Sequence, residues 1–157
     1  MTSVRVFALL VGSCLLLAAP AGAEDPAPNE GPEVVRGGSE LQALAAMPSA
    51  QRTGVETALI FTNVGGSEFR VLCAAYDAEG SPLGHAWTRI PARGMRVLLA
   101  SDFSAGADFA GPVECLALGR VVPSGLLLTP SGISAVGSER YHGVHADFVR
   151  FPLAASH

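Results

Sequence analysis

Short apolar runs, separated by turn-forming residues, dominate the chain from Val55 onward. No part of this region keeps the apolar spacing of a helix over a helix-length window. Short runs broken regularly by Gly, Pro, Asn and Asp are typical of an all-β sandwich or barrel, and we predict about seven antiparallel strands. The expected strands are residues 55–64, 68–76, 83–90, 95–100, 113–119, 121–129 and a last one near 144–151.

Two of these strands carry information about their place in the sheet. Residues 58–61 (Ala-Leu-Ile-Phe) are apolar on both faces, which indicates a central strand or one whose outer face is covered by a helix. Pro123 and Gly125 interrupt the run 121–129. Because proline cannot donate to a ladder, we expect this run to be an edge or bulged strand.

The segment before the strands predicts a leader and one helix. Residues 24–38 are rich in proline, glycine and acidic residues without periodicity, so we predict a disordered leader. A short helix is predicted over residues 39–47, with Ser39 as N-cap and with Leu41 and Leu44 on one face. A fully solvated leader is the alternative.

The first residues have the parts of a cleavable signal peptide. Arg5 precedes the apolar run 6–19, and Ala-Gly-Ala at 21–23 supplies the small-residue cleavage pattern before Glu24. The run is shorter than the about 20 apolar residues of a membrane span. We predict that residues 1–23 are removed, and that the protein is periplasmic or secreted with no membrane span.

A lipid anchor at Cys14 is the alternative outcome of export. Residues 11–14 (Val-Gly-Ser-Cys) loosely match the site at which a cysteine is acylated. The leucine-rich residues 15–19 follow, however, where a polar tether is usual.

The charge composition of the chain bears on which partners it can bind. The chain has 10 Lys+Arg against 14 Asp+Glu, and all of its basic residues are scattered arginines. Nucleic-acid binders concentrate Lys and Arg to neutralise phosphates, so we expect no nucleic-acid partner. The length suits one core, and residues 39–157 are predicted to form a single domain.

Removal of the signal peptide leaves Cys73 and Cys115 in a compartment where disulfides persist. Strand alternation places Cys73 opposite the face of Glu68 and Arg70, and Cys115 opposite Glu114, so both cysteines point into the core. We predict a Cys73–Cys115 disulfide that joins two sheets. A pair of buried free thiols is the alternative.

Residues 55–129 resemble a known class of domain through their turns. The signals are Asn63 after an apolar strand, Tyr76-Asp77-x-x-Gly80, Pro91-x-x-Gly94 and Ser101-Asp102. With them the chain resembles uncharacterised immunoglobulin-like β-sandwich domains of exported bacterial proteins. The resemblance implies a periplasmic or extracellular accessory module without catalytic residues. Such domains often carry a tryptophan packed on the disulfide, and Trp87 is the candidate here.

The histidines are candidate metal ligands. His142-x-x-His145, with Asp147 nearby and His85 from another strand, has the residue types that bind zinc. On a helix His142 and His145 would share a face, but on a strand their odd spacing puts them on opposite faces. Solvated histidines are the alternative.

The tail, residues 141–151, is the candidate binding surface. It brings together Tyr141, Phe148 and Arg150, and aromatic residues and arginine are enriched in interface hot spots. An ordinary final strand with core aromatics is the alternative.

No motif indicates catalysis. The sequence has no G-x-S-x-G elbow and no glycine-rich phosphate loop, and both mature cysteines are expected to be bridged. We therefore predict no enzyme and no cofactor. The expected function is that of an exported β-sandwich module that binds a protein, a glycan or an envelope surface. The alternative is a small periplasmic metal-binding protein that uses the histidines and Asp147.

Overall fold

The computed structural model of the chain describes residues 31–48, 51–117, 120–142 and 147–157. The expected signal peptide, including Cys14, lies outside these residues. The described part is mostly antiparallel sheet, which confirms the all-β prediction. The elements are α1 (Gly38–Ala46), β1 (Val55–Asn63), β2 (Phe69–Tyr76), β3 (Pro82–Ile90), β4 (Met95–Leu99), α2 (Ser101–Ser104), β5 (Phe109–Ala117), β6 (Val121–Thr129), β7 (Gly132–Val136), β8 (Glu139–His142) and β9 (Asp147–Ser156).

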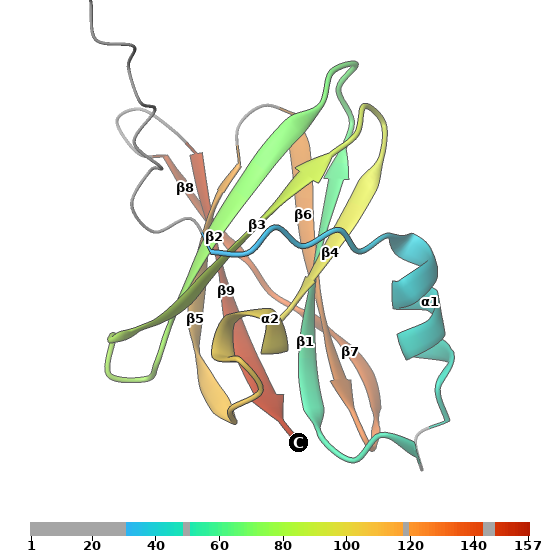
Figure 1. The fold of residues 1–157 in the computed structure, drawn as a ribbon, viewed down its shortest axis with the longest axis vertical. Coiled ribbons are helices and arrows are strands. Elements are labelled where there is room, and N and C mark those ends of the chain that lie inside the picture. Colours follow the sequence, from blue (N-terminus) through green and yellow to red (C-terminus); the bar gives the residue numbers. More distant parts are fainter. Residues whose placement is uncertain (1–30, 49–50, 118–119, 143–146) are drawn as a thin grey trace, which may run out of the picture.

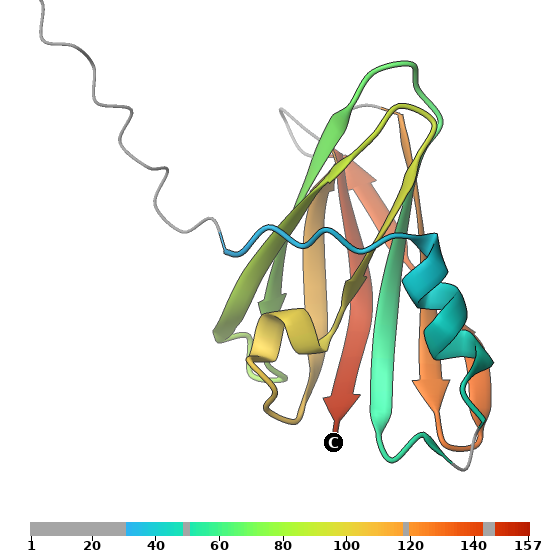
Figure 2. The same cartoon turned by 45° about the vertical axis from the view of Figure 1, so that its right-hand side comes forward.

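The strands form one hydrogen-bonded sheet in the order β3-β2-β5-β9-β1-β6-β7, with β4 beside β1 and β8 beside β9. All the ladders between these strands are antiparallel. β9 meets β1 only at its last residues, 155 and 156. On either side of this short junction lie two groups of strands, β3-β2-β5-β9-β8 and β4-β1-β6-β7 (Figures 1 and 2).

Apolar side chains from the two groups share one core. Phe61 on β1 meets Phe151 on β9 edge to face, with the ring centroids 6.4 Å apart, and both are fully buried. The cluster around them draws side chains from β1 to β6 and from β9. Because each such side chain contributes about 1.5–3 kcal/mol on burial, this core holds the two groups together.

A second, smaller cluster lies on the outer side of β1 and β4. Ala58 and Val97 are buried there, and Leu41 and Leu44 of α1 pack against them. β1 is also central, between β4 and β6. Both interpretations of its two apolar faces are therefore confirmed, as is the shared face of Leu41 and Leu44.

The N-cap prediction for α1 is wrong. The helix begins at Gly38, and the N–H of the capping residue Gly37 donates to a carboxylate oxygen of Glu40 at 2.5 Å. Since Glu40 is three residues after Gly37, its side chain supplies the acceptor of a capping box, and Ser39 lies inside the first turn of the helix.

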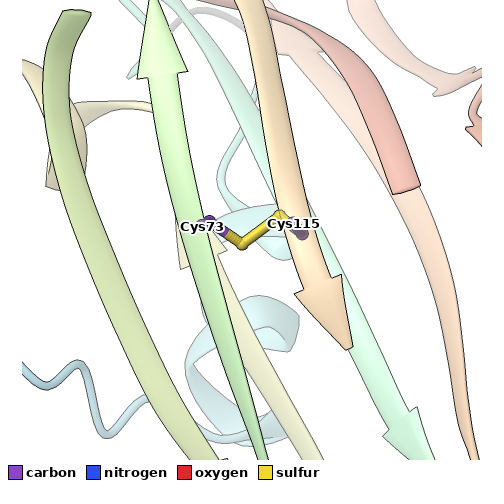
Figure 3. Close-up of a disulfide and its surroundings, with 2 residues drawn as sticks. All are labelled: Cys73 and Cys115. Atoms are coloured by element: carbon purple, nitrogen blue, oxygen red, sulfur yellow. A yellow bond between two sulfur atoms is a disulfide. The ribbon is translucent and has the colours of Figure 1, made fainter. Parts of the chain in front are cut away.

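The Cys73–Cys115 disulfide is present, with an S–S distance of 2.04 Å, and both cysteines are buried as predicted (Figure 3). The prediction that it joins two sheets is wrong. β2 and β5 are neighbours, Cys73 and Cys115 are direct partners in their ladder, and their Cα atoms are 4.1 Å apart. Directly opposite residues of an antiparallel pair approach to about 4.5 Å at the narrow positions, so the bridge forms without crossing the core.

Trp87 does not pack on the disulfide. It is the β3 partner of Leu72, whereas Cys73 is the partner of Ala86. Because successive residues of a strand point to opposite faces, Trp87 lies on the outer face while Cys73 faces the core. The tryptophan ring is covered instead by the guanidinium of Arg70, whose Cζ is 4.1 Å from the ring centroid.

The described chain has nine strands where about seven were predicted. The predicted runs correspond to β1–β6 and β9, and the prediction did not include β7 and β8, which are five and four residues long. β6 lies between β1 and β7, so it is no edge strand as a whole. β7 pairs with residues 125–129 of β6, and Pro123 lies in the half that β7 does not pair with.

Residues 31–37, which we call the N-terminal strap, differ from the disordered leader expected over 24–38. The backbone N–H of Trp87 on β3 donates to the carbonyl of Pro32 at 3.3 Å, and the carbonyl of Trp87 accepts the N–H of Val34 at 2.8 Å. The N–H of Val97 on β4 donates to Arg36 at 3.0 Å. The strap thus crosses from the β3 edge to the β4 edge (Figure 1). Its order comes from backbone pairing and from Val34, which packs on the core.

An ion pair fastens the strap. The Arg36 guanidinium contacts both carboxylate oxygens of Asp102 on α2, at 2.7 and 3.1 Å. Asp102 also accepts the N–H of Leu99 at 2.7 Å. Nearby, the half-buried carboxylate of Glu56 accepts the N–H of Ser101 at 3.1 Å. Burial raises the pKa of Glu56, and hydrogen bonds from the side chain and backbone of Ser101 and from the backbone of Ala100 oppose that rise.

Asn63 joins two of the predicted turns. Its buried amide donates to the carbonyls of Ser67 and Pro91 at 2.7 and 2.9 Å, and its oxygen accepts the N–H of Gly65 at 2.8 Å. One side chain therefore organises both the β1–β2 and the β3–β4 connections. The turn signal at Asn63 has a structural role.

Candidate functional site

Tyr141 and Phe148 form a stacked aromatic pair on the outer surface of the β8–β9 hairpin. They are direct partners in its ladder, with ring centroids 5.4 Å apart and an interplanar angle of 9°. Tyr141 is 39% exposed. The structure therefore brings these two predicted binding residues into contact, and the third, Arg150, lies two residues along β9 on the same side.

The aromatic pair is the end of a longer row. In register across five adjacent strands lie, from β3 to β8, Trp87, Leu72, Leu116, Phe148 and Tyr141. We call these five residues the outer row. With neighbouring strands about 4.8 Å apart, it extends about 19 Å across the sheet. None of the five side chains is fully buried.

The outer row is open because both helices pack elsewhere. α1 packs against β4 of the other group, and α2 packs against β3 and β4 at the side of the molecule (Figure 2). The opposite faces of β2, β5 and β9 form the core. A sheet with one face in the core and one toward solvent normally shows polar residues outside. An apolar and aromatic row there is the kind of feature that marks an interaction surface.

Charged groups surround the outer row. Arg150 lies 4.0 Å from Glu114 on β5, and Glu139 on β8 is its ladder partner. At the other end, the guanidinium carbons of Arg70 and Arg89 lie 4.1 and 5.3 Å from the Trp87 ring centroid. The surface therefore combines a central apolar row with a charged border, which is the organisation of protein interfaces.

Tyr141 is linked to this charged border. Partial burial, together with the nearby Glu114 carboxylate, which accepts its hydrogen bond, raises the pKa of the Tyr141 phenol. A phenol is neutral at physiological pH even at its ordinary pKa, so Tyr141 serves there as a hydrogen-bond donor.

A groove of about 710 Å³ continues from Arg150 toward the end of β9. The polar groups on its wall include Arg150, Glu139 and Ser138, and its apolar wall includes Pro112 and Pro152. The full lining is Ala110, Gly111, Pro112, Gly137, Ser138, Glu139, Arg150, Phe151, Pro152 and Leu153. The volume is within the range of small-molecule and short-peptide sites, about 300–1,000 Å³.

The predicted metal ligands are placed as follows. His145 lies outside the described residues, and His142 and Asp147 are ladder partners at the end of the β8–β9 hairpin. His85 is on β3, which β2 and β5 separate from β9. At about 4.8 Å per strand, this is about 14 Å, so His85 stands apart from the hairpin. Among the residues that the structure describes, no three His, Cys, Asp or Glu side chains gather. Metal binding at the hairpin stays a prediction.

Carboxylates in the turns have structural partners. Asp77 accepts the N–H groups of Glu79 and Ser81, at 3.1 and 2.7 Å, and so forms the β2–β3 turn. Asp102 is engaged with Arg36. These side chains stabilise loops, and they offer no set of convergent acids and bases for catalysis.

Tyr141 and Phe148, at one end of the outer row, are residues predicted from the sequence, whereas Trp87, Leu72 and Leu116 were not predicted as surface residues. Leu72 directly precedes Cys73, and Leu116 directly follows Cys115. Both cysteines are predicted on the core face. The same alternation therefore puts both leucines outside. That signal was present, but the alignment of the two leucines with Trp87 depends on ladder registers that one strand does not reveal.

Comparisons with protein-family models, with curated proteins and with solved structures found no match to this chain. No helix in the described ranges is long and apolar enough to cross a membrane.

Proposed function

We propose that this protein is an exported, non-enzymatic binding module, and that the outer row with its charged border is the surface that contacts its partner. The observation that carries the proposal is the alignment of five apolar or aromatic side chains on the open face of the sheet. Burial of such a row by a partner gains hydrophobic free energy, and aromatic residues with arginine supply the usual hot spots.

We propose an immunoglobulin-like β-sandwich for its fold and the periplasm or the extracellular space for its location. The two groups of strands that share one core support the sandwich. The disulfide supports an oxidising compartment, since such bridges persist after export. The signal-peptide pattern of residues 1–23 points to the same location. A disulfide between neighbouring strands and an outward tryptophan are departures from the immunoglobulin pattern.

Among envelope partners, the surface favours a protein. A sugar ring stacks on an open aromatic face, but the Trp87 face is covered by Arg70 at 4.1 Å. The alternation of Glu139, Arg150 and Glu114 around the row fits a partner with both signs of charge. A protein surface has this character, whereas a neutral glycan has none.

Capture from an envelope fraction tests the proposal. Immobilised wild-type protein should retain a specific partner, and Tyr141→Ala and Phe148→Ala should lower its retention at least tenfold, the loss that about 1.4 kcal/mol produces. Val64→Ala is the matched control, because Val64 is 57% exposed in the β1–β2 loop, away from the row. It should retain the partner as the wild type does.

Two outcomes would overturn the proposal. One is equal retention by all four proteins, which would place the contact elsewhere. The other is turnover of an ester or glycan by the purified protein without any retained partner. Partner loss on glycosidase treatment would identify a glycan in place of a protein.

A further inference from the structure

The two groups of strands differ in what covers their outer faces. On the β4-β1-β6-β7 group, α1 lies on the outer face, where its Leu41 and Leu44 pack against Ala58 and Val97. The outer row occupies the corresponding face of the β3-β2-β5-β9-β8 group. Neither α1 nor α2 covers it, since α2 turns Phe103 into the core. The chain therefore has on one face the kind of cover that the outer row lacks.

The face of a sheet offers a partner side chains and no backbone groups. The N–H and C=O groups of strands point within the sheet toward neighbouring strands, so a segment that lies over the outer row cannot pair with them. An extended segment would press its own unpaired N–H and C=O groups against Leu72 and Leu116, which is costly. A helix bonds these groups internally and presents only side chains. The outer row therefore favours a helix over an extended segment.

The outer row is narrow enough for one helix. The next positions on the same face are about 7 Å away along each strand. They carry charged side chains, namely Arg89 and Arg70 on one side and Glu114, Arg150 and Glu139 on the other. A second sheet laid on this face would bury both charged borders, which is costly. A helix about 10 Å wide covers the row and leaves the charges at its flanks.

The charged groups differ between the two ends of the row. At the β3 end, the guanidinium carbon of Arg89 lies 5.3 Å from the Trp87 ring centroid. The Arg89 side chain stays 58% exposed although a carboxylate of the N-terminal strap lies 3.6 Å away. At the β8 end, Glu139 and Glu114 stand on either side of Arg150. A partner helix gains from an acidic residue at the first end and from a basic residue at the second, which fixes its direction.

We propose that the partner presents an amphipathic helix to the outer row, laid across the strands with its acidic end near Arg89 and its basic end near Glu139. The inference rests on the proposed function, because it names what the outer row binds. The row is about 19 Å long, which corresponds to about 13 helical residues. Apolar side chains three or four apart along the helix lie over Leu72 and Leu116. This helix covers one group of strands as α1 covers the other.

Photocross-linking from both ends of the row measures the conformation of the partner. Trp87→p-benzoylphenylalanine and Tyr141→p-benzoylphenylalanine are each mixed with an envelope fraction and irradiated. The two positions are about 19 Å apart, a distance that about 13 residues span in a helix and about six in an extended segment. We expect the two cross-linked residues of one partner to lie about 13 apart, with apolar residues at helical spacing between them. The same amino acid at Val64, exposed in the β1–β2 loop, is the matched control and should not cross-link this partner.

Charge reversal tests the direction of the helix. Arg89→Glu and Glu139→Lys should each lower retention of the partner about tenfold, because each sets like charges against each other. Arg93→Glu and Glu79→Lys make the same changes at exposed turn positions away from the row, and they should retain the partner as the wild type does. Glu33→Gln removes the ion pair of Arg89 with the strap and keeps the cation, so it should also retain the partner.

A separation of about six residues between the two cross-linked positions overturns the inference, because an extended segment then lies on the row. Cross-links to two discontinuous segments of the partner overturn it as well, as does full retention by both charge-reversed variants. In each case the proposed function stands if retention still depends on Tyr141 and Phe148. Equal retention by Tyr141→Ala, Phe148→Ala and the wild type overturns the proposed function itself, so the two failures are distinguishable.

Discussion

Cys73 and Cys115 stand directly opposite each other on β2 and β5, with their Cα atoms 4.1 Å apart. On the other side of the same two strands, Leu72 and Leu116 are also direct partners, in the middle of the outer row. The covalent bridge thus fixes the β2–β5 register, which aligns the two leucines at the centre of the row. The oxidised state therefore supports the surface that we propose for binding as well as the core.

Removal of the bridge should weaken the fold. The two cysteines are 42 residues apart in sequence, and in the chain-entropy account a loop of this size corresponds to about 4 kcal/mol. We expect Cys73→Ala/Cys115→Ala to lower the free energy of unfolding by about this amount, measured by urea denaturation. Cys14→Ser is the control and should have no effect on the secreted protein. Two free thiols in mass spectra of the exported protein would contradict the assignment.

We expect both Asn63→Ala and the isosteric Asn63→Asp to lower the free energy of unfolding. The Asn63 amide donates to backbone carbonyls in two loops, and the Ile90 carbonyl among them is buried. Asn63→Ala leaves that buried acceptor unpaired, at about 1–3 kcal/mol. Asn63→Asp should cost more at pH 7, because a carboxylate would face those carbonyl oxygens. Relative to the wild type, the Asp variant should recover stability as the pH falls and the carboxyl is protonated. Equal stability of the Asp and Ala variants at all pH values would contradict this account.

Glu56 should make stability depend on pH. Burial raises its pKa in the folded protein above the ordinary value of 4.5, so the folded state holds the proton more tightly than the unfolded chain. This contribution to stability is present below pH 4.5 and is lost as the pH rises through the raised pKa. Glu56→Gln keeps an oxygen acceptor for the N–H of Ser101. For this variant we expect urea titrations to show a smaller decline of the free energy of unfolding between pH 4.5 and 7 than for the wild type. An unchanged pH profile would rule out this role.

The face of the strand to which each side chain points could be predicted from the sequence. Which strands are neighbours in the sheet could not. Alternation placed Cys73 and Cys115 in the core correctly, because the side-chain period of a strand is a local property. Which strands lie side by side depends on packing between distant segments. Both cysteines could therefore face inward from one group of strands as easily as from two. The prediction that Trp87 packs on the disulfide was wrong for the same reason, since its place relative to the bridge depends on the β2–β3 register.

The N-terminal strap was missed because its composition is that of a disordered segment. Prolines and acids without periodicity carry no helical or strand signal, yet Val34 and Arg36 find partners on β3, β4 and α2. Backbone pairing to an existing edge requires little from side chains. The outer row was likewise found only in part, since Tyr141 and Phe148 are close in sequence and Trp87 is not.

Loss of the Arg36–Asp102 ion pair should release the strap without unfolding the domain. Arg36 and Asp102 side chains are 24% and 13% exposed, and the contact is bidentate. In Arg36→Ala we expect the amides of Val34 and Val97 to exchange with solvent faster, while amides of β2 and β5 keep their protection. Arg120→Ala, at an exposed site outside the strap, is the control. Unchanged exchange at Val34 would show that backbone pairing alone holds the strap.

The metal alternative has a direct test. A ligand that binds the folded state raises its melting temperature. Because no three His, Cys, Asp or Glu side chains gather among the described residues, we expect an excess of Zn²⁺ to leave the melting temperature of the untagged protein unchanged. A rise that disappears in His142→Ala would instead support a site at the β8–β9 hairpin. His85→Ala is the control, since His85 stands three strands away from β9.

The N-terminal strap also imposes an order on folding. A polypeptide leaves the ribosome or a translocation channel with its N-terminal residues first, so Val34 emerges well before Trp87, and Arg36 before Asp102, 66 residues later. The strap has no docking site until β3, β4 and α2 have formed. The first described segment to appear is therefore among the last to settle, and until then the β3 and β4 edges are available to any chaperone that binds extended backbone.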